Sequence, residues 1–238
     1  MKEISAYLEL GTKYGIDHLR LEAIGRLQEL FPNNWDNFNR FKVGIMNIMK
    51  GNPKQAIIFD KPTRLVLQDL ATVIYFGRRF GVSSILPTAF YWCAQIPEDK
   101  LDNAFSEPYK LSREDLERCM VGRAELHKKV SLQRSFLSVA TADGCSQPQV
   151  CKEEIARRLH LESFMTAPFW SHAPLYSSSL IEAIGMCKNC TQLHVRRYEF
   201  IRGQVWASLP EIFDLPMSKP GSGWQCYGGW ESDPEPDE

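Results

Sequence analysis

The stretch Leu8-Glu-Leu-Gly-Thr-Lys-Tyr-Gly-Ile-Asp-His-Leu-Arg-Leu-Glu-Ala-Ile-Gly-Arg-Leu27 predicts two short helices joined by a tight turn. Gly15 suits the left-handed backbone conformation that closes a helix, so the first helix should cover residues 2–14. Asp17 stands where a side chain can cap the second helix. That helix should stop at Pro32, because proline has no amide hydrogen to donate. Such a hairpin cannot bury its apolar face alone, and we expect more helices to pack against it.

The rest of the chain continues the helical pattern. Apolar residues recur at three-to-four spacing, and the alternation of period two that marks strands is scarce. Ser112 and Asp115 resemble a capping box, which would open the longest helix. We therefore predict an all-α chain. Beyond the hairpin, helices are expected over residues 36–49, 64–80, 84–96 (capped by Ser83 or Ser84), 113–139, 149–164 and 189–208.

The end of the chain divides into an apolar segment and a tail. Pro210 should turn the chain so that Ile212, Phe213 and Leu215 fold back onto apolar surface. Residues 217–238 are rich in glycine, proline and acids and lack the apolar surface that would offset the entropy of ordering. We expect a helical bundle-like single domain with a disordered C-terminal tail. The predicted parts are residues 1–31, 32–216 and 217–238.

Composition excludes several classes of protein. Of the 238 residues, 44% are hydrophobic and 24% are charged, which is typical of a globular chain. No apolar run approaches the roughly 18–20 residues that a membrane helix needs. Residues 231–238 hold five acids, and without them 28 basic residues face 24 acidic ones. Because this excess is small for a nucleic-acid binder, we expect neither a nucleic acid nor a membrane as partner.

Residues of the opening stretch carry a resemblance to the closing helices of the BTB/POZ domain. They are Leu8, Leu10, Lys13, Tyr14, Ile16, Leu19 and Leu27. Residues 72–81, 84–91, 111–119 and 205–216 are similar to the helical extension after the BTB core in a fungal subfamily. The resemblance implies a non-enzymatic protein–protein interaction module. Some BTB families are adaptors for cullin-type scaffolds, and others act with transcription factors, so partners of these two kinds are implied.

The resemblance starts in the middle of the BTB pattern. Residues 1–31 match the closing helices, while the preceding three-stranded sheet has no counterpart, so the resemblance implies a truncated BTB protein. BTB dimerisation and cullin binding draw mainly on that missing part, and neither activity is carried over. If the sheet normally covers the hairpin, Ile4, Tyr7, Leu8 and Leu10 should stay partly uncovered.

Four of the seven cysteines form two pairs with the character of metal ligands: Cys145 with Cys151, and Cys187 with Cys190. Two intervening residues are the usual spacing of a chelating pair, and two pairs can supply four thiolates to tetrahedral zinc. The wider pair needs a turn, which Gly144 permits. An odd cysteine count does not suit a disulfide framework, so we expect an intracellular, cytoplasmic or nuclear setting. The predicted cofactor is one structural zinc ion.

Other interpretations of these residues stay open. Free cysteines often serve as small buried apolar side chains, and the two pairs could also form a redox centre. His172 or His194 could replace one sulfur ligand. The basic residues between His194 and Arg202 are otherwise typical of a solvated helix face. Cys93 and Cys119 fit helix positions in the core.

No catalytic signature is present in the sequence. A phosphate-binding glycine loop, a nucleophile elbow and a paired-histidine zinc motif are all missing. We therefore expect no enzymatic activity. Two functional classes remain: a BTB-type interaction module, and a zinc-stabilised regulatory protein linked to transcription.

Overall fold

The computed structural model describes most of the chain in two compact units. The described residues are 1–40, 56–58, 63–65, 67–95, 111–133, 141–160, 179–182, 184–216 and 224. The first unit is Met1–Gly122 with Leu209–Cys226, and the second is Arg123–Ser208 with Tyr227–Glu238. The domain bounds proposed from the sequence stay predictions. The tail expected over residues 217–238 lies outside the described residues, except for Trp224.

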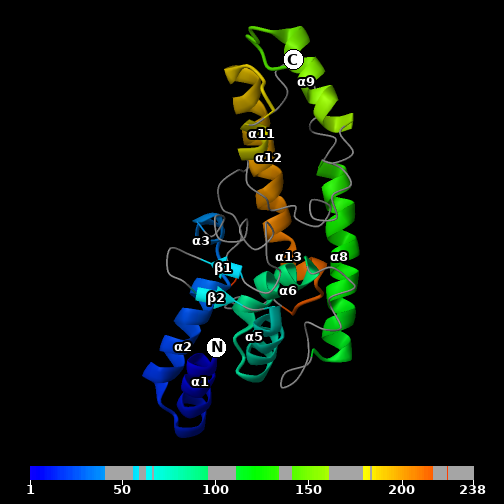
Figure 1. Ribbon diagram of the computed structural model, residues 1–238. Helices are drawn as coiled ribbons and strands as arrows, with labels where there is room; N and C mark the ends of the chain where they lie inside the picture. The colour runs from blue at the N-terminus through cyan, green and yellow to red at the C-terminus, as the bar shows by residue number, and fades with distance from the viewer. Residues whose placement is uncertain are drawn as a thin grey trace. The chain divides into compact units, whose positions relative to one another are not determined.

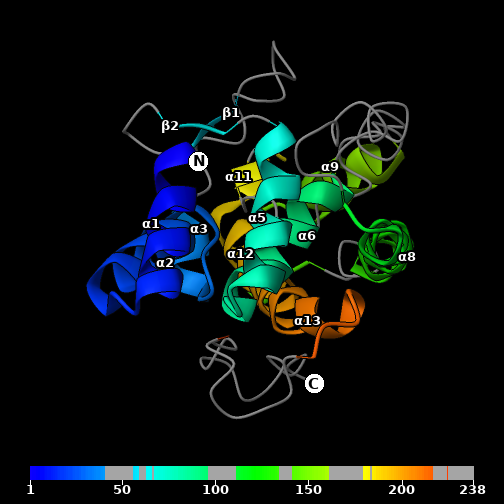
Figure 2. The same ribbon diagram turned by 90° about the horizontal axis from the view of Figure 1, so that it is seen from below.

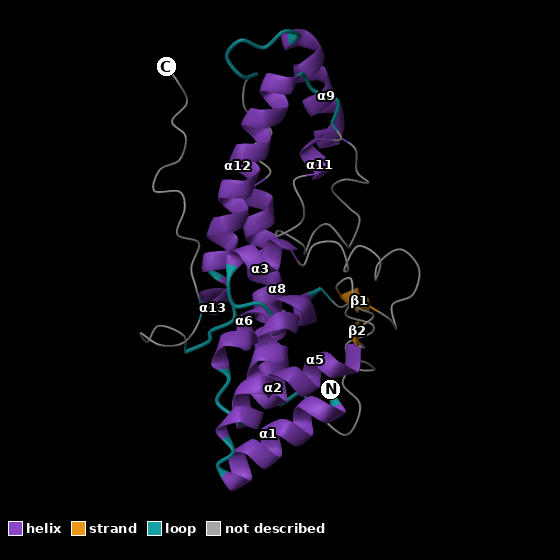
Figure 3. Ribbon diagram, turned by 90° about the vertical axis from the view of Figure 1, so that its left-hand side faces the viewer, coloured by secondary structure: helices purple, strands orange, loops and turns teal. Residues whose placement is uncertain are grey.

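The predicted all-α class is confirmed (Figures 1 and 3). The helices of the first unit are α1 (Lys2–Tyr14), α2 (Asp17–Leu30), α3 (Trp35–Arg40), α5 (Leu67–Arg79), the 3₁₀ turn η1 (Ser83–Ile85), α6 (Leu86–Ala94) and α13 (Leu209–Ile212). Helix α8 (Arg113–Gln133) starts in the first unit and ends in the second. The second unit holds α9 (Pro148–His160), α11 (Ser179–Glu182) and α12 (Lys188–Ala207). Several helices predicted to be longer reach the limits of the described ranges.

Two three-residue strands are an addition to the predicted elements. Strand β1 (Ala56–Ile58) pairs antiparallel with β2 (Thr63–Leu65), so that Ala56 lies opposite Leu65. The sequence-based helix over residues 64–80 therefore starts too early, and α5 begins only at Leu67. The β-branched residues of this segment favour extended backbone, which local apolar periodicity did not reveal.

Helices α1 and α2 form the predicted hairpin (Figure 1). Gly15 has a φ of 65°, the left-handed region that glycine enters without strain. The two helices approach so closely that a Cβ atom added to Gly11 would lie 2.8 Å from the backbone nitrogen of Arg20. Ile4 and Leu8 are buried on the same side of α1, so their expected exposure is wrong, whereas Tyr7 and Leu10 are at least partly exposed, as expected. The same side of α1 includes Gly11, which lies against Arg20, so α2 contributes to covering it.

The capping residues predicted for two helices differ from those observed. The backbone N–H of Ile16 donates to the carbonyl of Gly11 at 2.9 Å, which closes α1 and leaves Ile16 as the N-cap of α2. Asp17 is instead the first helical residue, where a negative charge favours the helix dipole. Ser84 lies within η1 and accepts a hydrogen bond from Gln28 instead of capping α6.

Gly15→Ala should lower the free energy of unfolding by about 1 kcal/mol, because alanine is strained at a positive φ. No atom lies within 4 Å of a Cβ added at Gly15, so crowding adds nothing to this effect. Gly25 is the matched control, since it is equally open but lies inside α2. Gly25→Ala should stabilise by up to about 1 kcal/mol. Urea unfolding followed by helical circular dichroism measures both, and changes of the same sign would contradict the role of the turn.

Helices α5 and α6 lie side by side at the centre of the first unit (Figure 2). Helix α6 is buried on nearly every side, as its apolar sequence predicted, and Pro87 stands in its first turn. On α5 the predicted face is buried at Leu70 and Ile74. The hydroxyl of Thr88 donates to the carbonyl of Pro32, which ties α6 to the end of the hairpin.

The start of α8 carries the predicted cap and a buried ion pair. The backbone N–H of Asp115 donates to the Ser112 hydroxyl at 3.0 Å, which confirms the capping interaction. Asp115 itself is buried, and its carboxylate accepts a hydrogen bond from Arg78 at 2.7 Å. Arg118 approaches the same oxygen at 3.5 Å. Two guanidinium groups thus compensate the burial of one carboxylate, which would otherwise be costly.

The segment after the last long helix folds back as predicted. Phe213 is 0% exposed and stacks on Phe90 of α6, with ring centroids 5.6 Å apart. A Cβ atom added at Gly122 would lie 2.2 Å from the Phe213 ring, so α8 leaves room for this ring only because residue 122 is glycine. Ile212 and Leu215 are also buried. We call residues 209–215 the clasp.

The second unit has its own apolar cluster, formed by α9, α11 and α12. Its buried members are Ile155, Ile181 and Ile184, and Met186, Val195 and Tyr198 pack against them. On α12 the side chains of His194 and Arg202 are fully buried. The sequence-based interpretation of a solvated basic face is therefore wrong for both. Arg202 is tolerated there because it pairs with Glu199 and lies over the Tyr198 ring.

Among the described helices, none combines the length and apolar composition that crossing a membrane requires.

Candidate metal centre

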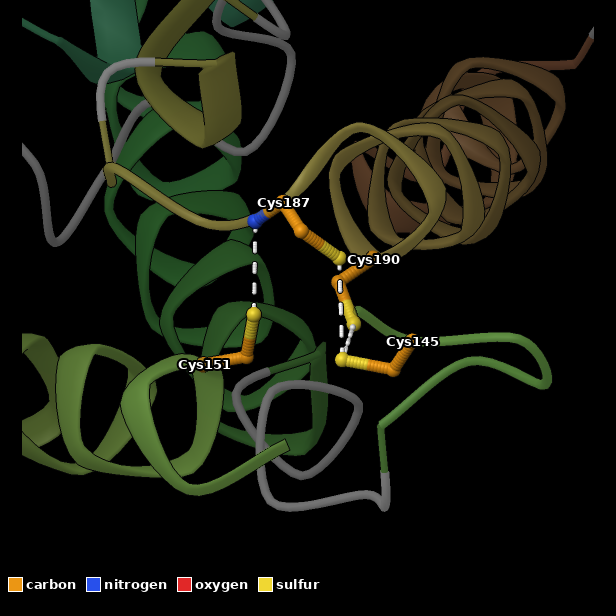
Figure 4. Close-up of side chains that lie close together, drawn as sticks. All are labelled: Cys145, Cys151, Cys187 and Cys190. Carbon is orange, nitrogen blue, oxygen red and sulfur yellow. Dashed lines mark hydrogen bonds between the residues drawn. The ribbon is translucent and has the colours of Figure 1, made fainter. Parts of the chain in front are cut away.

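The side chains of Cys145, Cys151, Cys187 and Cys190 converge within the second unit (Figure 4). Their four sulfur atoms all lie within 4.8 Å of one another. Cys145 comes from the turn before α9, and Cys151 from the first turn of α9. Cys187 directly precedes α12, and Cys190 lies in its first turn. The four cysteines thus come from the starts of two helices and from the turn before α9.

The turn that the wider pair needed is centred on Gly144. Its φ of 67° lies in the left-handed region, which favours glycine. The backbone N–H of Cys145 donates to the carbonyl of Ala142 at 3.0 Å and closes the turn. The side-chain amide of Asn189 donates to the Gly144 carbonyl at 2.8 Å. The turn is therefore held against the start of α12, and this points Cys145 toward the second pair.

Backbone amides surround the sulfur atoms. The N–H of Cys187 donates to the Cys151 sulfur at 3.3 Å, and the N–H of Ala142 donates to the Cys190 sulfur at 3.4 Å. The Cys145 sulfur lies 3.6 Å from that of Cys187 and 3.5 Å from that of Cys190. Hydrogen bonds of this kind stabilise thiolates and orient them, as outer partners do around metal ligands.

The four thiols differ in their electrostatic surroundings. Hydrogen bonding from the Cys190 backbone N–H lowers the pKa of the Cys187 thiol to about 6. Burial raises the pKa of the Cys190 and Cys151 thiols. Cys151 and Cys190 are fully buried, whereas Cys145 and Cys187 are partly exposed. Without a metal, burial keeps Cys151 and Cys190 as neutral thiols, whereas a divalent cation would favour their thiolate forms.

The arrangement can hold a metal ion, with one sulfur ligand from each residue. Soft thiolates in a tetrahedral set suit zinc or iron. Four sulfur ligands would leave no open position for water or substrate, which distinguishes structural zinc sites from catalytic ones. The geometry therefore allows a site that joins segments of chain, and it offers no place for a reaction at the metal.

The other candidate residues lie outside this group. His172 is outside the described residues, and His194 is not among the side chains that come together. Burial lowers the pKa of His194, which favours its neutral form. Cys93 and Cys119 are buried in the first unit, as expected for core positions. Sequence reasoning missed the donors at Ala142 and Asn189, since only the folded turn brings them to the site.

Comparisons with known proteins add no family to this description. No protein-family model matches the chain, and the searches of curated proteins and of solved structures find no significant match.

Proposed function

We propose that this chain is a non-enzymatic interaction protein whose second unit is stabilised by one structural zinc ion. The observation that supports the zinc ion is the grouping of four sulfur atoms within 4.8 Å. With zinc–sulfur bonds of about 2.3 Å, neighbouring sulfur atoms of a tetrahedral site lie about 3.8 Å apart. The Cys145 sulfur has neighbours at 3.5 and 3.6 Å, so small movements would complete the tetrahedron.

The free energies expected from apolar burial and from zinc binding support a structural role for the metal. The buried apolar cluster of the second unit contains three isoleucines, Ile155, Ile181 and Ile184. Burial of such side chains contributes about 1.5–3 kcal/mol each. Zinc binding to small four-ligand sites contributes about 10–16 kcal/mol at neutral pH. Zinc bound by all four cysteines would therefore be the largest single contribution to holding α9 against α12.

Metal analysis of the purified chain tests the zinc proposal. We expect about one equivalent of zinc per chain, because four thiolates bind one tetrahedral ion. Cys190→Ser should lose most of it, whereas Cys119→Ala should keep it, since Cys119 is a buried core residue of the first unit. Inductively coupled plasma mass spectrometry measures the metal and also distinguishes zinc from iron. A wild-type chain without metal would contradict the proposal.

The interaction role rests on the BTB resemblance and on the hairpin. Helices α1 and α2 contain the residues on which the resemblance to the closing BTB helices is based. The hairpin exposes large apolar side chains: Leu10 is 44%, Tyr14 61% and Leu21 63% exposed. Exposed apolar groups of this size are typical of protein-binding surfaces when they gather on one element. We propose other proteins as partners, and a scaffold of the cullin kind is the partner expected of an adaptor.

The alternative is a zinc-stabilised regulatory protein linked to transcription, and partner identity separates the two. Titration of the purified chain with a cullin scaffold would show binding if the chain is an adaptor. Leu10→Asp with Leu21→Asp should abolish that binding, while Val150→Asp, a substitution of an exposed residue of the second unit, should not. Binding to transcription factors without any to cullin would favour the alternative.

A further inference from the structure

We infer that the four-cysteine centre is also an oxidation site, at which a hydroperoxide joins Cys145 to Cys187 as a disulfide and releases the metal. The inference rests on the zinc site proposed above. It concerns these residues because the centre is unevenly buried and because the sulfur atoms of its two partly exposed residues lie close together.

Exposure divides the four cysteines into two classes. Cys151 and Cys190 are 0% exposed, whereas Cys145 and Cys187 are partly exposed. Oxidation of cysteine requires thiolate character and access for the oxidant. Zinc would hold all four residues as thiolates, so access is what distinguishes them. The first attack should therefore fall on Cys145 or Cys187.

Distance and exposure together favour one disulfide. The Cys145 and Cys187 sulfur atoms are 3.6 Å apart, so whichever is oxidised first has the other beside it. Cys190 lies 3.5 Å from Cys145, but it is buried and accepts a hydrogen bond from Ala142. The disulfide between Cys145 and Cys187 can thus start from either sulfur atom. The disulfide between Cys145 and Cys190 can start only from Cys145.

The chemistry balances with one hydroperoxide per disulfide. One thiolate attacks an oxygen of hydrogen peroxide, which forms a sulfenic acid and, with one proton, releases water. The second thiolate attacks that sulfur, the S–S bond forms, and the hydroxyl group leaves with another proton as a second water. Two electrons pass from the two sulfur atoms to the peroxide. The disulfide sulfurs are poor metal ligands, so the ion keeps only two thiolates and dissociates.

Oxidation would affect the turn around Gly144 and helix α9 differently. The turn around Gly144 would stay joined to α12, through the new disulfide and through the hydrogen bond from Asn189. Cys151, the ligand from α9, would lose its link through the metal. Helix α9 would keep its contact at Ile155 with the apolar cluster. We therefore expect oxidation to loosen α9 and to leave the turn in place.

The experiment uses the chain of residues 1–238, first analysed for zinc and then treated with hydrogen peroxide. A chromogenic zinc indicator follows release, and mass spectrometry of proteolytic peptides identifies the disulfide. We expect the Cys145–Cys187 link to form in step with the release of one zinc per chain. Cys93 and Cys119, both buried in the first unit, are the internal control. They should react at least about ten times more slowly, because burial limits access. Dithiothreitol followed by zinc should restore the starting state.

Each outcome decides one of the two proposals. Zinc release together with the Cys145–Cys187 link supports the inference. A chain that holds zinc but keeps it in peroxide, or that first forms a disulfide through Cys151 or Cys190, overturns the inference and leaves the structural zinc intact. A chain without zinc before any peroxide is added contradicts the proposed site itself, and the inference fails with it.

Discussion

Phe213→Ala should destabilise the first unit by about 3–5 kcal/mol, the range for removing a fully buried aromatic side chain. The ring is 0% exposed and stacks on Phe90, so its loss leaves a cavity between α6 and α8. For a chain of this size the melting temperature should fall by about 6–20 °C. Thermal unfolding followed by circular dichroism measures the change. Val121→Ala is the control, because Val121 is 56% exposed and should shift stability by less than about 0.5 kcal/mol.

Substitution of Gly122 tests the packing of Phe213 against α8 more directly. In the wild-type chain Gly122→Ala should be strongly destabilising, because the new Cβ would lie 2.2 Å from two carbon atoms of the Phe213 ring. In the Phe213→Ala background those atoms are absent, and the same substitution should be neutral or slightly stabilising, since alanine favours helix. A double-mutant cycle measures this coupling. Additive effects would show that the clasp does not pack on α8 in solution.

Removal of the proposed zinc ion should produce the second large effect, confined to the second unit. A zinc chelator should raise amide hydrogen exchange in α9 and at the start of α12, because it would remove the proposed four-thiolate link between them. Cys190→Ser should reproduce this effect. Exchange in the α1–α2 hairpin should stay unchanged, since the hairpin belongs to the first unit. Hydrogen-exchange mass spectrometry resolves these segments separately.

Thr191→Ser is the matched control for Cys190→Ser. It changes the neighbouring residue but keeps the hydroxyl, which donates to the carbonyl of Met186. Exchange in α9 should therefore remain at the wild-type level. If chelation and Cys190→Ser both left the exchange of α9 unchanged, the metal would have no structural role.

Much of the fold followed from local patterns. Gly15 closes α1 where the sequence placed the turn, and Ser112 caps α8 as its capping box predicted. The burial of Phe213 followed from a proline turn and three apolar residues. These features depend on backbone conformations and side chains within one or two helical turns, so the sequence is enough to predict them.

Features that depend on distant residues were not predictable. Asp17 failed as a cap because the hydrogen bond from Ile16 to Gly11 sets where α2 begins. Arg202 is buried, although a charged side chain is expected in solvent, because tertiary packing decides the exposure of a helix face. At the metal centre the cysteine spacing identified the four residues that come together. Their uneven exposure could not be read from spacing, and that unevenness determines how the centre should react with oxidants.

The two cysteine pairs are separated by a long stretch of chain, with Cys151 and Cys187 36 positions apart. The entropic cost of closing a loop grows only with the logarithm of its length, by about 0.6 kcal/mol for each doubling. The geometry within each pair, by contrast, is set by single turns at Gly144 and at the start of α12. In any set of related sequences, insertions and deletions should therefore accumulate between the pairs, while the spacing inside each pair stays constant.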